Sequence, residues 1–91
     1  MAVCDILHQR AEDVARRHEV RAHTDLTEAL KGRDIDAVYI ATPVFLHVPQ
    51  AIEALAAGKH VIVEKPVGVS YAQAQQLLQA SNSAKGRCAV A

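Results

Sequence analysis

Short apolar runs and amphipathic segments alternate along this chain, and this alternation constrains the fold more than any other feature. The apolar runs predict strands at residues 1–5, 19–23, 37–41, 61–63 and 88–91. Between them, apolar residues at helical spacing predict helices at residues 9–18, 46–57 and 71–85, and a short one between Asp25 and Gly32. Strands that alternate with helices over short connections form right-handed crossovers and a parallel sheet. We therefore predict an α/β fold with a parallel, doubly wound sheet.

Composition limits the core that these elements can build. Hydrophobic residues make up 51% of the 91 residues, aromatic residues only 3%, and there is no Trp. The core must therefore consist of small side chains, which suits helices packed closely on a sheet. The runs Ala37–Ala41 and Val61–Val63 have no polar alternation, which predicts strands covered on both faces. Cys4 and Cys88 are interpreted as reduced core residues, because no signal peptide indicates an oxidising compartment.

Glycine, proline and serine mark the expected helix ends. Ser70 is in position to cap the helix that follows it. Gly58 and Gly86 are expected to close the helices that precede them. Pro49 is acceptable in its predicted helix because it falls in the first turn.

Charge and hydropathy exclude several classes of partner. Lys plus Arg is 10 and Asp plus Glu is 10, so the net charge is zero and no basic patch predicts nucleic-acid binding. No apolar run approaches the ~20 residues needed to span a bilayer, so we expect no membrane partner and a cytoplasmic protein. A neutral chain with open strand edges also tends to self-associate, which predicts a homo-oligomer.

Lys65 is the first candidate for chemistry. The run Val61–Val63 ends in Glu64, Lys65 and Pro66, so a buried strand delivers a charged pair to its carboxyl end, where open α/β sheets bind ligands. Pro66 has no amide hydrogen for a ladder and stops the strand there. A partly buried ammonium can move protons near neutral pH, although the neighbouring Glu64 opposes this. The alternative is a solvated Glu64–Lys65 ion pair without function.

Asp5 follows the first predicted strand, where dinucleotide-binding sheets place the acid that bonds the adenosine ribose. A carboxylate there accepts hydroxyl hydrogens and repels a 2′-phosphate, which favours NAD over NADP. The alternative is an ordinary strand-end or helix-capping Asp. A G-x-G-x-x-G loop should lie ~20 residues upstream of such an acid, but no such pattern occurs in the chain.

Other catalytic arrangements have less support. No pair of histidines has helical i, i+4 spacing or the close Cys-His spacing of a zinc site, so we expect no metal. The histidines fall on different predicted elements, at His8, His18, His23, His47 and His60. No G-x-S-x-G elbow is present, so a serine nucleophile is not indicated either.

Three blocks of sequence together resemble the Gfo/Idh/MocA oxidoreductase family. They are Asp5, the run Asp36–Pro43 (DAVYIATP) with His47 beyond it, and Gly58–Pro66 (GKHVIVEKP). The resemblance covers nearly the whole chain, and the spacing of the blocks makes it specific. It implies the later part of an N-terminal NAD(P)-binding Rossmann domain. It also implies hydride transfer between NAD(P) and a sugar, polyol or similar small hydroxy compound.

The resemblance also implies which residues form the site. The cofactor would be bound by strand ends and the loops that follow them, at Asp5, Ala41, Thr42, Pro43, His47, Glu64, Lys65 and Pro66. Asp5 would hold the adenosine ribose, and Pro66 would fix its loop through a cis bond. Lys65 would be the catalytic residue, placing the substrate hydroxyl and assisting its proton transfer.

By the same resemblance, residues 1–91 would be a partial NAD(P)-binding Rossmann domain. The first strand, the glycine-rich loop and the substrate domain would be missing. We then expect NAD to bind without tight affinity, NADP to bind less well than NAD, and this chain alone to be inactive. The rival interpretation is a catalytically inactive truncated or remnant chain, at most a self-associating structural module.

Overall fold

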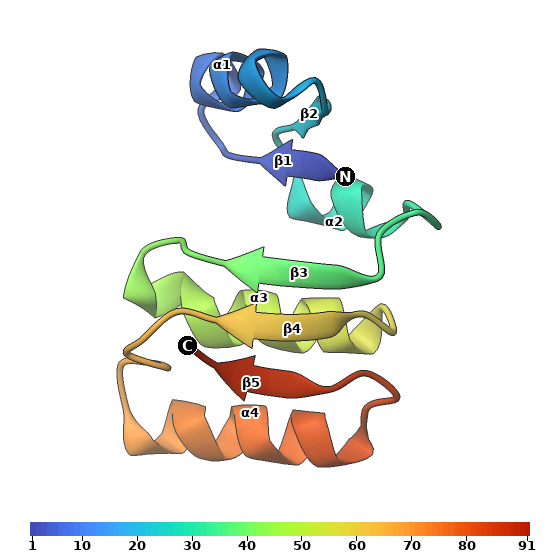
Figure 1. Cartoon of the computed structure of the whole chain (residues 1–91). Helices are drawn as coiled ribbons and strands as arrows, with labels where there is room; N and C mark the ends of the chain where they lie inside the picture. The colour runs from blue at the N-terminus through green and yellow to red at the C-terminus, as the bar shows by residue number, and fades with distance from the viewer. The chain divides into compact units, whose positions relative to one another are not determined.

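The structure, a computed structural model, describes all residues from 1 to 91. Strands and helices alternate as predicted (Figure 1). The elements are β1 (Ala2–Cys4), α1 (His8–His18), β2 (Arg21–His23), α2 (Leu26–Leu30), β3 (Ala37–Ile40), α3 (Val44–Ala56), β4 (His60–Val63), α4 (Tyr71–Ser83) and β5 (Cys88–Val90). The chain divides into two compact units, Met1–Ile35 (unit 1) and Asp36–Ala91 (unit 2), and each is described by itself.

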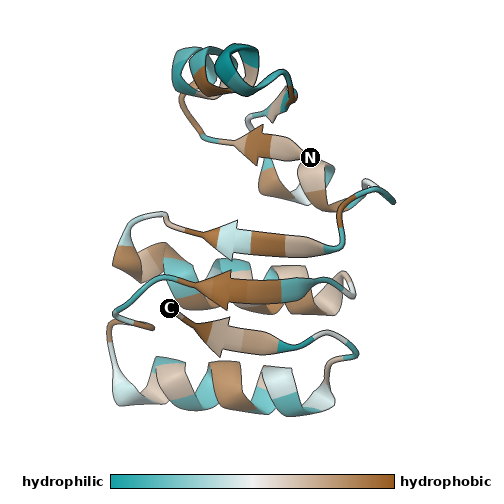
Figure 2. Cartoon of the chain, viewed as in Figure 1, coloured by the Kyte–Doolittle hydropathy of each residue, from teal (hydrophilic) through white to brown (hydrophobic).

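Unit 1 is built on a parallel pair of strands. β1 pairs with β2 in a register that places Val3 opposite Ala22. Helix α1 packs on one side of this pair and α2 on the other (Figure 1). The inward face of α1 buries only the small residues Ala11 and Ala15, while its outer surface is strongly hydrophilic (Figure 2). The core of unit 1 is therefore small.

Unit 2 is a three-stranded parallel sheet in the order β3-β4-β5. Helices α3 and α4 contact each other and cover one face of this sheet (Figure 1). The core lies between helices and sheet, and it consists mostly of aliphatic side chains of modest size: Ile40, Val48, Ala51, Ala54, Leu55, Val61, Val63 and Leu77. This confirms that small side chains fill the interior.

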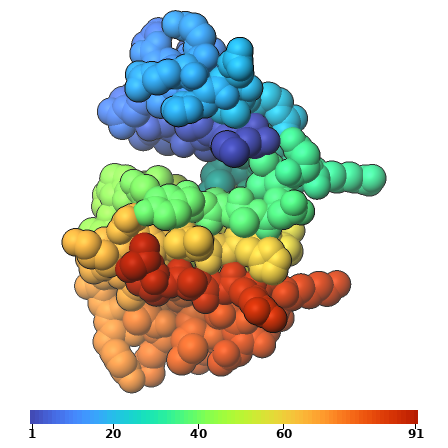
Figure 3. Space-filling view, viewed as in Figure 1, coloured from blue at the N-terminus to red at the C-terminus, as the bar shows by residue number.

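The strands of unit 2 are covered on one face only, so the prediction of two covered faces was wrong. Burial alternates along β4, where Val61 and Val63 are buried but Ile62 is 45% exposed. Tyr39, opposite Ile62 in the register, is 58% exposed. In Figure 3, β3, β4 and β5 are visible with no helix of unit 2 in front of them. The apolar residues that alternate with the buried ones in these strands lie on the other face of the sheet, which no helix of unit 2 covers.

The parallel strands are confirmed, but they form two small sheets rather than one. The doubly wound order 3-2-1-4-5-6 explains this division, because its first strand separates the second from the fourth. With β1 of this chain as the second strand and β3 as the fourth, no direct pairing between them is expected. The two small parallel sheets fit a partial Rossmann-like domain.

Helix α3 begins at Val44, two residues before the predicted start. Pro43 is the N-cap residue, and its carbonyl accepts the Leu46 amide at 2.9 Å. Pro49 consequently lies inside the helix rather than in the first turn. Gly58 closes α3 as predicted, in a left-handed conformation with φ of 78°. Its amide bonds the Leu55 carbonyl at 2.9 Å, and the next amide, of Lys59, bonds the Ala54 carbonyl at 3.1 Å, which is a Schellman motif.

Helix α4 begins as predicted but ends earlier. The Ser70 side chain accepts the Gln73 amide at 3.1 Å and caps the helix. The last helical residue is Ser83, so the prediction that Gly86 ends the helix was wrong. A Cβ on Gly86 would lie 2.1 Å from the Lys59 carbonyl oxygen. Gly86 is thus required by close backbone contact at the start of β4.

The two cysteines are free thiols that lie in strands, as expected, but they are not core residues. Cys4 is exposed and Cys88 is half-buried. Burial, with nearby Asp25 and Asp5, raises the pKa of the Cys4 thiol, and burial alone raises the pKa of Cys88. None of the helices combines the length and the apolar composition needed to cross a membrane.

Candidate functional site

The carboxyl ends of β3 and β4 lie side by side. Ile40 pairs with Val63 in the parallel register, and the Glu64 amide bonds the Ile40 carbonyl at 2.9 Å. The two strands therefore release their loops at one level and one edge of the sheet. The structure brings together two groups of predicted site residues here, Ala41–Pro43 and Glu64–Pro66. The Lys65–Pro66 bond is cis.

His47 connects these two loops. It lies in the first turns of α3 and is only 3% exposed. Its Nε2 atom is 2.7 Å from the Thr42 carbonyl oxygen, and its Nδ1 atom is 2.8 Å from the Pro66 carbonyl oxygen. Both ring nitrogens are thus engaged by backbone. A direct hydrogen bond from this ring to a cofactor would require one of these contacts to open.

Glu64 is held in a fixed orientation. The Tyr39 hydroxyl donates to its Oε1 atom at 2.5 Å, and the Lys65 amide donates to its Oε2 atom at 2.9 Å. The hydrogen bond from Tyr39 and the bond from the Lys65 amide lower the pKa of the Glu64 carboxyl. The same hydrogen bond to Glu64 raises the pKa of Tyr39. Glu64 therefore carries its negative charge through neutral pH.

Lys65 presents an unpaired ammonium. The residue is exposed, and its side chain makes no hydrogen bond or ion pair. Glu64, although adjacent, directs its carboxylate to the Tyr39 hydroxyl and to the Lys65 amide instead. The interpretation of Glu64 and Lys65 as a simple ion pair was therefore wrong. The ammonium remains available to a ligand at the carboxyl edge of the sheet.

Tyr39 and Gln50 contact this edge but were missed in the sequence. Gln50, on α3, accepts a hydrogen bond from the Thr42 hydroxyl at 2.6 Å. Tyr39 reaches Glu64 diagonally across the β3–β4 pair, since Tyr39 is opposite Ile62 and Glu64 is two residues further along. Residues at such diagonal positions share a face of the sheet. The strand register would have identified Tyr39, whereas nothing in the sequence singles out Gln50.

Asp5 lies at the end of β1 in unit 1. Its Oδ1 atom accepts the Leu7 amide at 2.8 Å, and its Oδ2 atom is 3.3 Å from the Arg10 guanidinium. These contacts fit the ordinary role of a strand-end Asp, while α1 has no side-chain cap at its N-cap residue, Leu7. They also leave acceptor capacity, because an ionised carboxylate has about four lone-pair sites. Asp5 directly follows the last residue of β1, at the carboxyl end of that strand.

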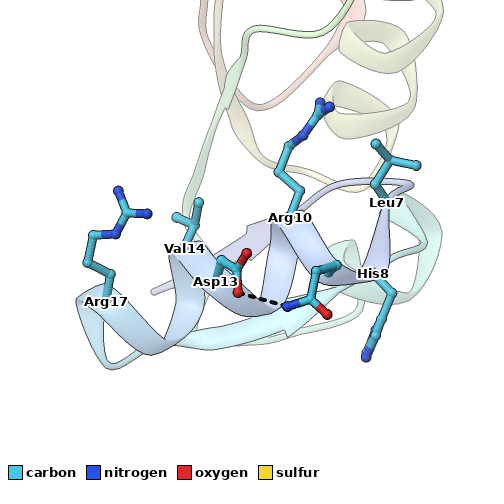
Figure 4. A pocket seen from close by; sticks show the side chains of 7 residues that line it. Leu7, His8, Arg10, Asp13, Val14 and Arg17 are labelled. Carbon is cyan, nitrogen blue, oxygen red and sulfur yellow. Dashed lines mark hydrogen bonds between the residues drawn. The ribbon is translucent and has the colours of Figure 1, made fainter.

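An open hollow of about 550 Å³ lies along α1 (Figure 4). Its lining comes from the N-cap residue and from residues along the length of α1: Leu7, His8, Gln9, Arg10, Asp13, Val14 and Arg17. None of the predicted site residues is among them. Gln9 bonds Asp13 at 2.8 Å, and the lining charges have both signs, so the hollow is no specific anion site. No cluster of metal-binding side chains is present in the structure.

Comparison with known proteins decides the family. The sequence profile of the Gfo/Idh/MocA family, described as an oxidoreductase family with an NAD-binding Rossmann fold, matches residues 1–91. The chain belongs to this family. The resemblance inferred from Asp5, Asp36–Pro43 and Gly58–Pro66 is confirmed, and with it the assignment to an NAD-binding Rossmann fold.

Individual relatives are similar over nearly the whole chain. The 4-carboxy-2-hydroxymuconate-6-semialdehyde dehydrogenase of a Sphingobium species is 42% identical over 82 residues, which cover 90% of this chain and 26% of that protein. The WlbA dehydrogenase of Bordetella pertussis, solved with NADH and UDP-GlcNAcA, matches with a TM-score of 0.95 at 30% identity, over 100% of this chain and 26% of that one. The 3-ketoreductase KijD10 of Actinomadura kijaniata, solved with NADP and TDP-benzene, matches with a TM-score of 0.85 at 31% identity, over 92% and 27%.

The chain thus spans about a quarter of the length of these proteins. Both NADH and NADP occur among the solved neighbours, so the family fixes a nicotinamide dinucleotide without choosing between them. The residues present fit two parts of such a cofactor. Asp5 offers a carboxylate for hydroxyl groups, and Lys65 offers an unpaired ammonium, each at the carboxyl end of a strand.

Proposed function

We propose that this chain forms part of an oxidoreductase that transfers hydride between NAD(P) and a sugar, polyol or similar small hydroxy compound. Residues 1–91 correspond in this proposal to the later part of the NAD(P)-binding domain, without the substrate domain. One observation carries it: Ala41–Pro43 and Glu64–Pro66 leave paired strands side by side, with the Lys65 ammonium unpaired. These loops form the nicotinamide side of the site.

Lys65 is the catalytic residue in this proposal. A bound nicotinamide dinucleotide supplies the hydride donor or acceptor. The Nζ atom of Lys65 holds the substrate oxygen. As the ammonium it donates a proton when a carbonyl is reduced, and as the neutral amine it accepts the hydroxyl proton when a hydroxyl is oxidised. Glu64 lines the cofactor beside it, with its carboxylate oriented by Tyr39 and the Lys65 amide. Thr42, oriented by Gln50, faces the same edge from the neighbouring loop.

Asp5 supports NAD over NADP in the proposal. Its carboxylate accepts ribose hydroxyl hydrogens and repels the additional phosphate of NADP. Arg10, 3.3 Å away, reduces that repulsion in part. We therefore propose a preference for NAD that is modest in size. The Asp5→Asn variant should reduce the preference, since the amide keeps the shape but not the charge.

Two measurements test the function. If the chain binds NADH with a Kd near 1 mM, 10 mM NADH should stabilise it by about 1.4 kcal/mol in a melting experiment. The absence of any shift at such concentrations would remove independent cofactor binding. In a full-length relative of this chain, the Lys65→Ala substitution should lower kcat far more than it weakens NADH binding. An unchanged kcat would exclude Lys65 from the mechanism.

A second candidate function is a catalytically inactive, self-associating module. The exposed apolar side chains of Tyr39 and Ile62, which lie opposite each other on one sheet face, favour it. Zero net charge removes the repulsion that would keep copies apart. Sedimentation of the wild type and of an Ile62→Lys variant tests this candidate. Wild-type oligomers that dissociate in the variant, together with no response to NADH, would favour the module over the oxidoreductase.

A further inference from the structure

The two contacts of His47 constrain its protonation. Both partners, the carbonyl oxygens of Thr42 and Pro66, are hydrogen-bond acceptors that cannot donate. A neutral imidazole has one N–H and one bare nitrogen. In that form, one of the two contacts would set a nitrogen lone pair against a carbonyl lone pair at less than 3 Å. Only the imidazolium, with a proton on each nitrogen, satisfies both contacts.

A buried imidazolium must offset the loss of hydration. Two charge-assisted hydrogen bonds do part of this, since such bonds are about twice as strong as neutral ones. The Glu64 carboxylate adds attraction, and the charge of His47 is one of the causes that lower the pKa of Glu64. The position near the start of α3 acts in the opposite direction, because the amino end of a helix is positive.

The other charged groups around His47 are few. Lys65, beside Glu64 at the end of β4, is cationic and exposed. On α3 the only charged residue is Glu53, while β3 contributes only Tyr39 as a titratable group. Helix α4, which packs against α3, has no charged side chain. The immediate hydrogen-bond partners of the ring are therefore the Thr42 and Pro66 carbonyl oxygens.

We propose that His47 is a positioning residue that carries a proton on both ring nitrogens and thereby holds the two strand-end loops at a fixed spacing. The consequence for the cofactor rests on the proposed function: the fixed spacing presents Thr42 and the Glu64–Lys65 pair to the nicotinamide together. Removal of one ring proton must break one of the two bonds. The loops then become free to separate as the pH rises.

The wild-type chain provides the first test, without any cofactor. Nitrogen-15 NMR of the histidine rings should show two N–H protons on His47 under conditions in which the ring of His60 shows only one. As the pH rises and one proton is lost, amide signals in residues 41–43 or 64–67 should shift with the same midpoint. A single N–H at every pH, or loop signals that ignore the ring, would overturn the proposal. His60 is the internal control for the number of ring N–H protons. Its Nδ1 atom accepts the Arg87 amide at 3.0 Å and so carries no proton in this structure, unlike the Nδ1 atom proposed for His47.

Variants provide the second test. His47→Phe keeps a ring of similar size but has no donor, and it should shift the loop amides and weaken NADH binding roughly tenfold. His47→Gln restores one donor and should recover part of both effects. His18→Gln, at an exposed position on α1, is the matched control and should change neither. If wild type fails to bind NADH, independent cofactor binding by this chain is excluded, while the loop signals still test His47. Unchanged loop signals in His47→Phe would exclude the positioning role.

Discussion

Gly86 is a position where a single methyl group should have a large effect. It is buried where the chain passes the start of β4 before entering β5. A Cβ there would lie 2.1 Å from the Lys59 carbonyl oxygen and 2.7 Å from its carbonyl carbon. Both are backbone atoms, so no side-chain rotation can relieve the contact. The chain would have to move by more than an ångström to reach an ordinary contact of about 3.4 Å.

This displacement would disturb the hydrogen bonds that pair β4 with β5. The Val61 amide bonds the Arg87 carbonyl at 2.8 Å, next to the clash. Overpacking of a close contact costs about 1–3 kcal/mol, and loss of one hydrogen bond about 0.5–1.5 kcal/mol. We therefore expect Gly86→Ala to lower the free energy of unfolding by about 2–4 kcal/mol. The total free energy of unfolding of a chain of this size is only about 5–14 kcal/mol.

Urea unfolding followed by circular dichroism measures this effect. With a slope typical of small domains, the midpoint should fall by about 1–3 M. Gly58→Ala is the matched control, because Gly58 has φ of 78° but no atom within 4 Å of an added Cβ. It should cost only about 1 kcal/mol from backbone strain. If Gly58→Ala is as destabilising as Gly86→Ala, the steric argument is wrong.

Three further predictions concern the same chain. Val63→Ala should lower the free energy of unfolding by about 2–3 kcal/mol, because Val63 is fully buried. Ile62→Ala should lower it by well under half of that, because Ile62 is 45% exposed. Equal losses in urea unfolding would contradict the burial of only one sheet face. Tyr39→Phe should raise the pKa of Glu64 towards its ordinary value of 4.5, which carbon-13 NMR can follow. Because the folded-state pKa of Glu64 is lowered, its stabilising contribution is present above about pH 4.5 and is lost as the pH falls through the lowered pKa, so wild type and Tyr39→Phe should converge in acid. Ser70→Ala should cost about 1 kcal/mol of stability in thermal unfolding, since Ser70 caps α4 through the Gln73 amide, and an unchanged melting temperature would exclude that cap.

Much of the candidate site could be predicted because strand ends are marked in the sequence. Pro43 and Pro66 stop pairing soon after β3 and β4, so the residues before them had to lie at the carboxyl edge. The role of Tyr39 could not be predicted without the register, because its hydroxyl meets Glu64 across two strands. The bonds of His47 likewise join backbone groups 5 and 19 residues away. Such contacts depend on where loops converge, which local pattern does not encode.

By itself, the sequence of this protein determined the order of strands and helices, the capping of α4 by Ser70, the closure of α3 by Gly58 and the family. These features depend on local periodicity, on backbone preferences of single residues and on the spacing of short motifs. Tertiary structure alone decided which strand faces are covered, why Gly86 must lack a side chain, and how His47 and Tyr39 hold the loops that carry Thr42 and Glu64. Those outcomes arise from distant segments packed at ångström distances, where sterics and hydrogen-bond geometry, rather than residue type, select the arrangement.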